Sequence, residues 1–408
     1  MSKQEFLTDI QIGLARLKEA GQTVTLIHHN DADGLASGAI MQQTLHRAGF
    51  TVHRIPLERV HPPIIARIHD QFATPLVYVD LGGKAAPMIS DINQSRRFTL
   101  ILDHHHPEPA TDPQVLNLTT EFYGLSGDMD ISAATAAYLF ATISNEKNCD
   151  LAYLGVVGAL GDLHDRGGKL VGENRLALEQ AVFLEQVKVE QRSGREQYLL
   201  TRFGEPVPMV SFCQSLTTLG APGYYMDGPA LGIKMCLEGP FAKAEQKLAE
   251  LNQIKEVAYQ KVLTRLEQDG FKQTRYCQWF SVESDFVPMG VKTIGEFCDE
   301  IKDMPIVDPY KYLVGCQIMD GTIPGLGTFA WNLYKVSMRL PTPLEKRVVV
   351  DQTMPSLDYI VPAAAQTVDG SIDACHSYSA ATVIPIGREK ILVDTMDALV
   401  EQVQTLPS

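Results

Sequence analysis

The stretch Leu-Ile-His-His-Asn-Asp-Ala-Asp-Gly-Leu-Ala-Ser-Gly, residues 26–38, ends an apolar run and begins a segment with the pattern of a helix. The apolar run, residues 23–28, is short and rich in β-branched side chains, which is typical of a buried strand. His29, Asp31 and Asp33 follow it at once. In an open α/β sheet, ligands bind where the strands end, so this stretch predicts such a sheet with a polar site at its edge.

Three further segments have the same character as residues 23–28. Residues 51–55, 75–79 and 98–102 are short, apolar and rich in β-branched side chains, and helix-like segments lie between them. This alternation predicts a parallel sheet that is covered by helices on both faces.

Polar side chains also follow the third and fourth predicted strands. Asp80 comes directly after residues 75–79, and Asp103, His104 and His105 come directly after residues 98–102. One aspartate after a strand is usually a turn residue or a helix cap. Aspartates that follow three predicted strands favour one shared site, because the ends of these strands meet at the same edge of the sheet.

A further aspartate is expected near this edge. Ser132 has the character of a helix cap before a helix at 133–143, and a very apolar helix at 150–160 ends in Gly161 and Asp162. A helix this apolar is expected to be buried, which would place Asp162 next to the core; an exposed Asp at a helix end is the alternative. His28, His106 and His164 are interpreted as structural, with a supporting role at the site as the alternative for the last two.

These residue types fit divalent cations. Mn²⁺ and Mg²⁺ prefer oxygen ligands, Mn²⁺ also accepts imidazole, and two such ions about 3.5–4 Å apart promote phosphoryl displacement. The candidate ligands are His29, Asp31, Asp33, Asp80, His104 and Asp162. The sequence contains neither the His-Glu-x-x-His pattern of zinc proteases nor the glycine-rich loops that bind nucleotide cofactors.

The remainder of the chain predicts a second part. Residues 241–268 show the apolar spacing of an amphipathic helix, which is expected to pack on its own chain, with a partner protein as the alternative. Strands are expected at 334–339 and 380–385, with a final helix at 389–404. We therefore expect a metal-binding domain at 1–190, a helical middle segment at 191–275 and a smaller α/β domain at 276–408.

The composition narrows the possible functions. With 408 residues the chain has room for two or three domains, and its net charge of −14 argues against a broad basic surface that coats duplex nucleic acid. Neither a secretory signal nor an apolar run long enough to span a membrane is present, so a soluble, cytoplasmic protein is expected. The seven scattered cysteines predict reduced thiols in the core.

Together, the motifs resemble those of the DHH phosphoesterase superfamily. The matching segments, in the family's order, are His29-Asn-Asp-Ala-Asp33-Gly34, Val79-Asp80-Leu-Gly82, Asp103-His104-His105 and Gly161-Asp162. The first 200 residues are similar to archaeal RecJ-like proteins, including the GINS-associated nuclease. By this resemblance, Asp80 bridges two Mn²⁺ or Mg²⁺ ions, His29, Asp31 and Asp162 complete one site, and Asp33 and His104 complete the other. His105 would then face the scissile phosphate, and Asp103 would orient the two histidines.

The last part of the chain resembles the DHHA1 substrate domain. Lys335-Val-Ser-Met-Arg339 looks like its arginine-bearing strand, and residues 374–381 look like its Gly-Gly-His-x-x-Ala-Ala-Gly loop. The sequence departs from this loop because Ala374, Cys375 and Ala381 stand where the family has glycine, which lets backbone approach a phosphate closely. The resemblance implies substrate contacts from Arg339, Lys335, His376 and Ser379.

The resemblance implies a metal-dependent phosphodiesterase of the RecJ-like exonuclease type, which hydrolyses single-stranded DNA or RNA from an end to nucleoside monophosphates. A cleft between the two domains would admit a single strand. Alternatives within the superfamily are a nanoRNase or cyclic-dinucleotide phosphodiesterase and, more distantly, a family II pyrophosphatase. An alternative of another class is a replication scaffold that binds GINS-like partners, because the superfamily includes a degenerate helicase subunit of eukaryotes.

Overall fold

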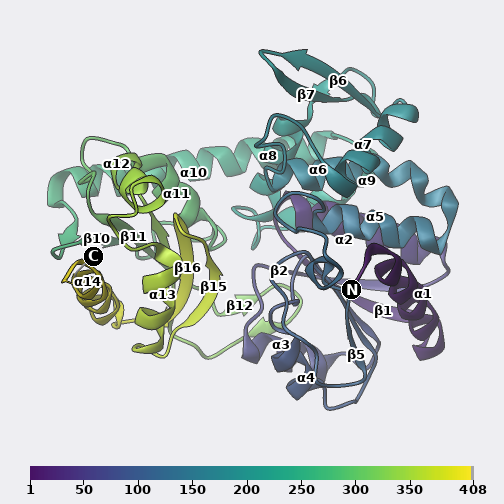
Figure 1. Cartoon of the computed structure of the whole chain (residues 1–408), viewed down its shortest axis with the longest axis horizontal. Coiled ribbons are helices and arrows are strands. Elements are labelled where there is room, and N and C mark those ends of the chain that lie inside the picture. The colour runs from purple at the N-terminus through teal and green to yellow at the C-terminus, as the bar shows by residue number, and fades with distance from the viewer. Residues whose placement is uncertain (406–408) are drawn as a thin grey trace. The chain divides into compact units, whose positions relative to one another are not determined.

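The computed structural model describes residues 1–405, without the side chains of Asp373, Ala374 and Thr405. The chain forms two compact units (Figure 1). The first comprises Met1–Ala249 together with Pro324–Leu326, and the second comprises the rest of the described chain from Glu250. Each unit has its own sheet and its own core.

The first unit is built on a five-stranded parallel sheet in the order β2-β1-β3-β4-β5. Its strands are β1 (Thr23–His29), β2 (Thr51–Leu57), β3 (Leu76–Val79), β4 (Thr99–Leu102) and β5 (Val115–Asn117). The four predicted strands and their parallel arrangement are confirmed. The fifth strand, of three residues, was not predicted because it is too short to show a pattern.

The strand order explains where a ligand site can form. The chain passes from β1 through α2 (Ala32–Arg47) to β2, then returns through α3 (Pro62–Gln71) across β1 to β3, and continues through α4 (Ala86–Asn93) to β4. Right-handed crossovers in opposite directions place α3 and α4 on the face opposite to α2 (Figure 1). The order reverses between β1 and β3, and the crevice at their carboxyl ends is the expected ligand position.

A group of helices packs around α2 in the same unit. Helix α2 contacts α5 (Ala133–Ser144) and α6 (Ala152–Gly161), and α6 contacts α7 (Gly172–Phe183) and α8 (Met209–Gly220). The helices predicted around residues 133–143 and 150–160 are thus confirmed, and the side chain of Ser132 caps α5 by accepting a hydrogen bond from the Thr135 amide.

Further elements complete this unit. They are α1 (Lys3–Ala20), the 3₁₀ turns η1 (Thr120–Tyr123) and η2 (Glu146–Leu151), the small antiparallel sheet of β6 (Val187–Arg192), β7 (Arg195–Leu200) and β8 (Val207–Pro208), and α9 (Gly228–Glu238). The middle segment predicted as helical therefore begins with strands. The predicted amphipathic helix is α10 (Ala242–Asp269), within which the boundary between the two units lies. The predicted domain limits at 190 and 275 stay predictions.

The second unit has a six-stranded sheet in the order β15-β16-β14-β11-β10-β9. Its strands are β9 (Lys272–Gln273), β10 (Cys277–Ser281), β11 (Tyr312–Ile318), β14 (Leu333–Arg339), β15 (Ser371–Cys375) and β16 (Ser379–Pro385). The β10–β11 pair is parallel and the other pairs are antiparallel. A hairpin of β12 (Thr322–Ile323) and β13 (Gly327–Thr328) stands apart from this sheet.

The helices of this unit are α11 (Thr293–Ile301), α12 (Thr342–Glu345), the π-helical turn η3 (Lys346–Val350), α13 (Leu357–Gln366) and α14 (Glu389–Thr405). Buried side chains of α13 and α14 form one core with those of β10, β11 and β14. The predicted strands at 334–339 and 380–385 and the predicted final helix are confirmed. Residues 406–408 of the predicted third domain lie outside the described residues.

All seven cysteines are free, and five of them are buried, as predicted; Cys149 and Cys375 are partly exposed. Among residues 1–405, none of the helices combines the length and the apolar composition that crossing a membrane requires.

Candidate metal centre

Three neighbouring strands of the first unit deliver polar side chains to one edge of the sheet. His29 is the last residue of β1, Asp80 directly follows β3, and Asp103 directly follows β4. The parallel register aligns His28 with Val79 and Val79 with Leu102, so the next residues along these strands lie side by side. The structure therefore brings these side chains together at one edge, where the sequence analysis expected them.

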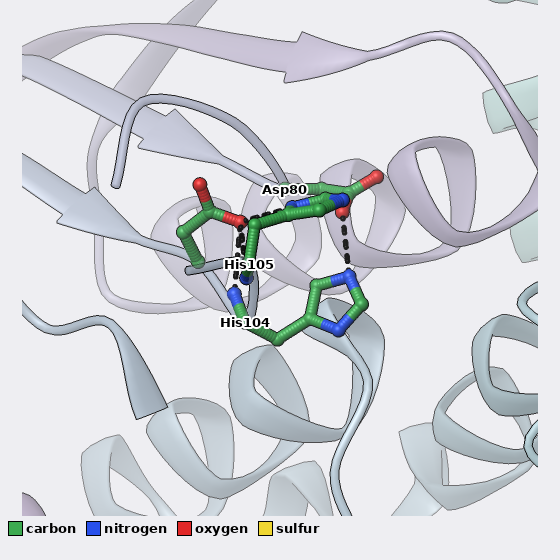
Figure 2. A group of neighbouring side chains, drawn as sticks. Asp80, His104 and His105 are labelled. Carbon is green, nitrogen blue, oxygen red and sulfur yellow. Dashed lines mark hydrogen bonds and ion pairs between the residues drawn. The ribbon is translucent and has the colours of Figure 1, made fainter. Parts of the chain in front are cut away.

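Asp80 lies at the middle of this site. Its carboxylate is 2 % exposed, with Oδ2 lying 3.3 Å from Nδ1 of His29 and Oδ1 lying 3.4 Å from Nε2 of His104. Figure 2 shows the His104 ring turned toward Asp80. The backbone of Asp80 has a φ of +63°, which is unfavourable for a residue with a side chain. Such strain is typical of functional sites, where the surrounding structure holds it in place.

Asp31 completes one side of the centre. Its Oδ1 caps α2 by accepting a hydrogen bond of 3.0 Å from the Gly34 amide, and its Oδ2 lies 3.1 Å from Nδ1 of His29. One ligand atom from each of His29, Asp31 and Asp80 lies within 4.8 Å of the others. The helix cap and the predicted ligand are therefore the same residue, with one oxygen for each role.

Asp33 is held more tightly than the sequence indicated. Its two oxygens accept hydrogen bonds of 2.8 Å from the amides of Ala133 and Ala134, at the start of α5, and the side chain is fully buried. Gly158 makes room for it, because a Cβ there would lie 2.0 Å from Oδ1 of Asp33. Burial, and then the charges of Asp80 and Asp162, raise the pKa of Asp33 well above its ordinary value. Asp33 therefore anchors α5, and its Oδ2 also lies 3.7 Å from Nε2 of His104.

Asp103 positions the two histidines that follow it. Its Oδ1 accepts hydrogen bonds from the His104 amide (2.8 Å), the His105 amide (3.3 Å) and Nδ1 of His105 (2.7 Å), and its Oδ2 accepts one from Gly83 (2.8 Å). Burial works against the charge, but His105 and then His104 hold the pKa of Asp103 below its ordinary value. Burial alone would lower the pKa of His105. The negative charge of the Asp103 carboxylate has the larger effect, so the pKa of His105 is raised above its ordinary value.

Asp162 reaches the same centre from the end of α6. Its Oδ2 lies 3.2 Å from Nε2 of His104, and its side chain is 26 % exposed. Burial lowers the pKa of His104, but its ion pairs with Asp162 and Asp80 raise it well above the ordinary value. Burial also works against the charge of Asp162, and His104 keeps the pKa of Asp162 below its ordinary value.

His164 supports this group. Its ring lies 5.9 Å from that of His104, and its Nδ1 lies 2.8 Å from the side-chain nitrogen of Asn174. Burial lowers the pKa of His164 to about 4, so the ring is neutral at physiological pH. His28 is a buried strand residue, as predicted, whose Nδ1 lies 2.7 Å from the His29 carbonyl, whereas His106 is 81 % exposed and lies 3.6 Å from Glu121.

The centre has the properties of a cation site. Oδ1 of Asp80 and Nε2 of His104 are buried, and within the described chain neither has a hydrogen-bond partner. Five aspartates gather here (Asp31, Asp33, Asp80, Asp103 and Asp162), and the charged neighbours that shift the pKa values of Asp33, Asp103 and Asp162 are other aspartates and histidines. Buried carboxylates need a compensating charge, and oxygen ligands with two imidazoles suit Mn²⁺ or Mg²⁺. The residues present therefore fit divalent cations.

Arg59 is a further residue of this edge that was not predicted from the sequence. This residue follows β2 at the same edge of the sheet, close to Glu58, whose carbonyl oxygen lies 3.3 Å from Nε2 of His29. Arg59 is only 6 % exposed, and its buried Nε and Nη1 have no hydrogen-bond partner among residues 1–405. A buried guanidinium with open donors is a site for an anion. The sequence does show that Arg59 follows a strand. It was not predicted because only aspartates and histidines were considered at the strand ends.

The predicted substrate residues lie in the second unit. Arg339 ends β14 opposite Ser379 of β16, and the His376 amide donates a hydrogen bond of 2.8 Å to the Ser379 carbonyl. Lys335, which is 5 % exposed, shares a face of β14 with Arg339. Nε of Arg339 already donates a hydrogen bond of 2.7 Å to Asp299. The structure thus brings Arg339, Ser379 and His376 together and leaves Lys335 further along the strand.

A family model matches the part of the chain that contains every candidate ligand except Asp162. Residues 23–158 match the model of the DHH family, N-terminal domain. An uncharacterized protein of Methanocaldococcus jannaschii is 27% identical over 172 residues, which cover 41% of this chain and 38% of that protein.

Solved structures share the fold over nearly the whole chain. RecJ in complex with Mn²⁺ from Thermus thermophilus has a TM-score of 0.63 at 14% identity, covering 99% of this chain and 55% of RecJ. CDC45 from Entamoeba histolytica has a TM-score of 0.58 at 12% identity, covering 96% of this chain and 99% of CDC45. The chain spans less than two thirds of the length of the curated relative and of that RecJ. The fold matches that of RecJ-like DHH proteins.

Proposed function

Since residues 23–158 are a DHH-family N-terminal domain on a RecJ-like fold, we propose that this protein is a divalent-metal-dependent phosphodiesterase. It hydrolyses single-stranded DNA or RNA from an end and releases nucleoside monophosphates. The observation that carries the proposal is the position of Asp80, whose two carboxylate oxygens face His29 on one side and His104 on the other. A carboxylate in this position can join two metal sites.

The ligand assignment follows the predicted roles. Asp80 would bridge two Mn²⁺ or Mg²⁺ ions, His29, Asp31 and Asp162 would complete one site, and Asp33 and His104 would complete the other. When bound, such ions supply Lewis-acid stabilisation of phosphoryl oxygens and a water of lowered pKa. The contact of 3.2 Å between Asp162 and His104, and the grouping of these two residues with His164, favour Asp162 as a ligand on the His104 side of the centre instead.

His105 would act on the substrate directly. Its side chain is 55 % exposed, in contrast to the 5 % exposure of His104, and Asp103 holds Nδ1 at 2.7 Å. With Nδ1 engaged, Nε2 is the nitrogen that faces outward and donates to a phosphate oxygen when the ring is protonated. The raised pKa of His105 favours this protonated form.

Arg59 and the second unit would hold the nucleotide. The open Nε and Nη1 donors of Arg59 lie on different edges of the guanidinium, and each can donate a hydrogen bond to an anionic oxygen. In the second unit, Arg339, Ser379, His376 and Lys335 would contact the substrate in the manner of a DHHA1 domain. The engagement of Arg339 by Asp299 leaves its Nη2 edge for a phosphate.

Hydrolysis of end-labelled single-stranded DNA, single-stranded RNA and oligomers of two to five nucleotides tests the proposal. Each substrate is incubated with Mn²⁺ or with EDTA, and the wild type is compared with Asp80→Ala. Metal-dependent shortening of the long strands from one end, absent in Asp80→Ala, supports the exonuclease. Cleavage confined to the short oligomers, or to cyclic dinucleotides, would replace it with the nanoRNase or cyclic-dinucleotide alternative.

A replication scaffold that binds GINS-like partners is the second candidate function. The likeness of the fold to CDC45 supports it. The gathering of His29, Asp31, Asp80, His104 and Asp162 in groups able to hold a metal ion favours an enzyme, because a scaffold has no need of such a centre. If no substrate is cleaved under any metal condition, the scaffold becomes the better account.

A further inference from the structure

Two permanently charged cations lie in the loops at the edge of the sheet that carries the metal centre. Between the ends of β1 to β4 and the elements that come next, the sequence contains one arginine, Arg59, and one lysine, Lys84. The candidate metal ligands around them are aspartates and histidines. Arg59 has been considered above as a phosphate-binding residue, whereas Lys84 belongs neither to the ligand set nor to the substrate residues.

The loop that carries Lys84 lies on the β4 and β5 side of the centre. The amide of Gly83, the residue before Lys84, donates a hydrogen bond of 2.8 Å to Oδ2 of Asp103, which follows β4. The Gly83 carbonyl accepts a hydrogen bond of 3.2 Å from the side chain of Asn117, the last residue of β5. Lys84 therefore stands next to Asp103, whose Oδ1 lies 2.7 Å from Nδ1 of His105.

The positive charge of Lys84 is free to bind a ligand. The residue is exposed, and its ammonium group has no ion pair among residues 1–405. The neighbouring Asp103 carboxylate already accepts hydrogen bonds on both oxygens, from Gly83 on one and from His104 and His105 on the other. A lysine supplies three donors and a full charge, so an exposed one beside a phosphodiesterase centre suits a phosphate of the substrate.

Arg59 and Lys84 lie on opposite sides of the metal centre. In the sheet order β2-β1-β3-β4-β5, Arg59 follows the edge strand β2, whereas the Lys84 loop contacts the ends of β4 and β5. His29 and Asp80, at the ends of β1 and β3, lie between them. Neighbouring strands are about 4.8 Å apart, so β2 and β4 are separated by about 14 Å. The two cations therefore suit different phosphates, with the scissile phosphate between them.

The different exposure of the two cations gives the substrate a direction. Arg59 is only 6 % exposed and suits the closed end of a site, whereas the exposed Lys84 leaves room for a strand to continue into water. We propose that Lys84 binds the phosphate next to the scissile one, on the part of the strand that remains after cleavage. This inference rests on the proposed phosphodiesterase activity, and it names the substrate class as strands that extend at least one phosphate beyond the cleaved bond.

Release of the first nucleotide from three strands tests this assignment. Each strand has about ten nucleotides and a label on the nucleotide at the end that the wild type cleaves. One strand is unmodified, and the other two carry a neutral methylphosphonate at the second or at the fifth linkage from that end. Lys84→Ala should lower kcat/KM about five- to tenfold for the unmodified strand and for the strand modified at the fifth linkage. Lys84→Arg should keep most of the wild-type rate, because the positive charge stays.

The strand modified at the second linkage separates phosphate binding from a structural role of Lys84. Removing the charge of that one phosphate should lower kcat/KM of the wild type by the same factor as Lys84→Ala does. Lys84→Ala should then cause little further loss on this strand, because the phosphate that Lys84 binds has no charge left. A residue that only supports the fold would lower the rate equally on all three strands.

The dependence of the rate on salt is a second readout. Each phosphate contact contributes about 0.7 to the slope of log K against log salt for single strands, so the slope for the unmodified strand should be smaller by about this amount in Lys84→Ala. Lys147→Ala is the matched control, because Lys147 is also an exposed lysine of the first unit without an ion pair among residues 1–405. This control should match the wild type on every strand, and thermal unfolding confirms that each variant is folded.

Two results would overturn the assignment of Lys84 while the proposed activity stands. The first is a Lys84→Ala protein that cleaves the unmodified strand as the wild type does. The second is a loss of the same size on all three strands. A wild type that releases no nucleotide from any strand in Mn²⁺ would instead overturn the proposed exonuclease together with this inference, so the two failures can be told apart.

Discussion

Nδ1 of His104 lies 2.8 Å from the carbonyl oxygen of Gly127, 23 positions further along the chain. Because a carbonyl oxygen only accepts hydrogen bonds, Nδ1 must carry the hydrogen, and the neutral ring then has its lone pair on Nε2. Nε2 is the nitrogen that points to Asp80 and Asp162. The loop that contains Gly127 therefore fixes the form of His104 that binds a metal ion, as supporting residues of metal sites commonly do.

This contact predicts the effect of Gly127→Ala. A Cβ at this position would lie 1.7 Å from the carbonyl oxygen of His104, so the loop must move and the bond to Nδ1 must break. We expect the affinity for Mn²⁺ to fall about 10–100-fold. Isothermal titration with Mn²⁺ measures this, with Gly167→Ala as the control, since a Cβ at Gly167 meets nothing within 4 Å. Equal affinities of Gly127→Ala and wild type would contradict this role.

Asp103→Asn tests whether Asp103 acts through His105. The asparagine keeps the shape of the side chain but removes the charge that raises the pKa of His105. We expect kcat to fall about 10²-fold, which is within the usual contribution of a positioned acid or base. The affinity for Mn²⁺ should change much less, and the alkaline side of the pH profile of activity should shift to lower pH, because the protonated form of His105 is the one that donates to phosphate. A loss of metal affinity as large as the loss of kcat would instead make Asp103 a metal ligand.

Arg59→Ala tests the residue that the sequence analysis missed. Loss of a charge-assisted hydrogen bond to phosphate costs about 1.5–3 kcal/mol, which corresponds to a fall in kcat/KM of about 10–150-fold. Arg59→Lys should recover only part of this, because an ammonium group cannot reproduce the fixed directions of the guanidinium donors. Steady-state hydrolysis of labelled oligonucleotides measures the effect, with Arg96→Ala at an exposed ion pair as control. Unchanged kinetics in Arg59→Ala would exclude a role in substrate binding.

Asp112 predicts a pH dependence of stability that is unrelated to metal binding. Its carboxylate accepts hydrogen bonds from Asn93, from Ser95 and from the Gln114 amide. Burial works against the charge, but these bonds hold the pKa of Asp112 below its ordinary value. A carboxylate with a lowered folded-state pKa stabilises the fold above its unfolded pKa of about 3.9, and this stabilisation is lost as the pH falls through the folded pKa.

Urea unfolding of wild type and Asp112→Asn at several pH values checks this. At neutral pH we expect the variant to be less stable by about 1–3 kcal/mol. The difference should shrink as the pH is lowered below about 4, where this carboxylate first takes up a proton in the unfolded chain, and it should be lost once the pH passes the lowered pKa of the folded protein. A difference that stays constant between neutral and acidic pH would show that the charge of Asp112 contributes nothing.

Much of this fold could be predicted because its signals are local. The strands β1 to β4 are short apolar runs in the sequence. The polar residues that follow β1, β3 and β4 indicate the edge of the sheet at which these strands end. The grouping of His29, Asp80 and His104 follows from the rule that parallel strands end at one edge. The contact between Ser132 and the first turn of α5 was likewise visible as a capping residue before a helix.

Other features depend on contacts that no local pattern contains. Asp33 accepts hydrogen bonds from amides at the start of α5 that lie 100 and 101 positions further along the chain. The hydrogen bond from His104 to Gly127 involves a loop whose sequence shows no periodicity. The strands β6 to β8 were missed because their sequences are mostly polar, and only Val187, Tyr198 and Leu200 of β6 and β7 are buried, which is too few to show a clear alternation. The ion pair of Arg339 with Asp299 could not be predicted, because it depends on the packing of α11 against β14.

The number of Mn²⁺ ions bound per chain tests the central claim most directly. Equilibrium dialysis of the wild type should give two ions per chain, with the electron paramagnetic resonance spectrum of a spin-coupled pair, because Asp80 would join both sites. Asp80→Asn should lose the coupled signal and most of the binding. Fewer than two bound ions in the wild type, or two coupled ions retained in Asp80→Asn, would contradict a phosphodiesterase centre bridged by Asp80.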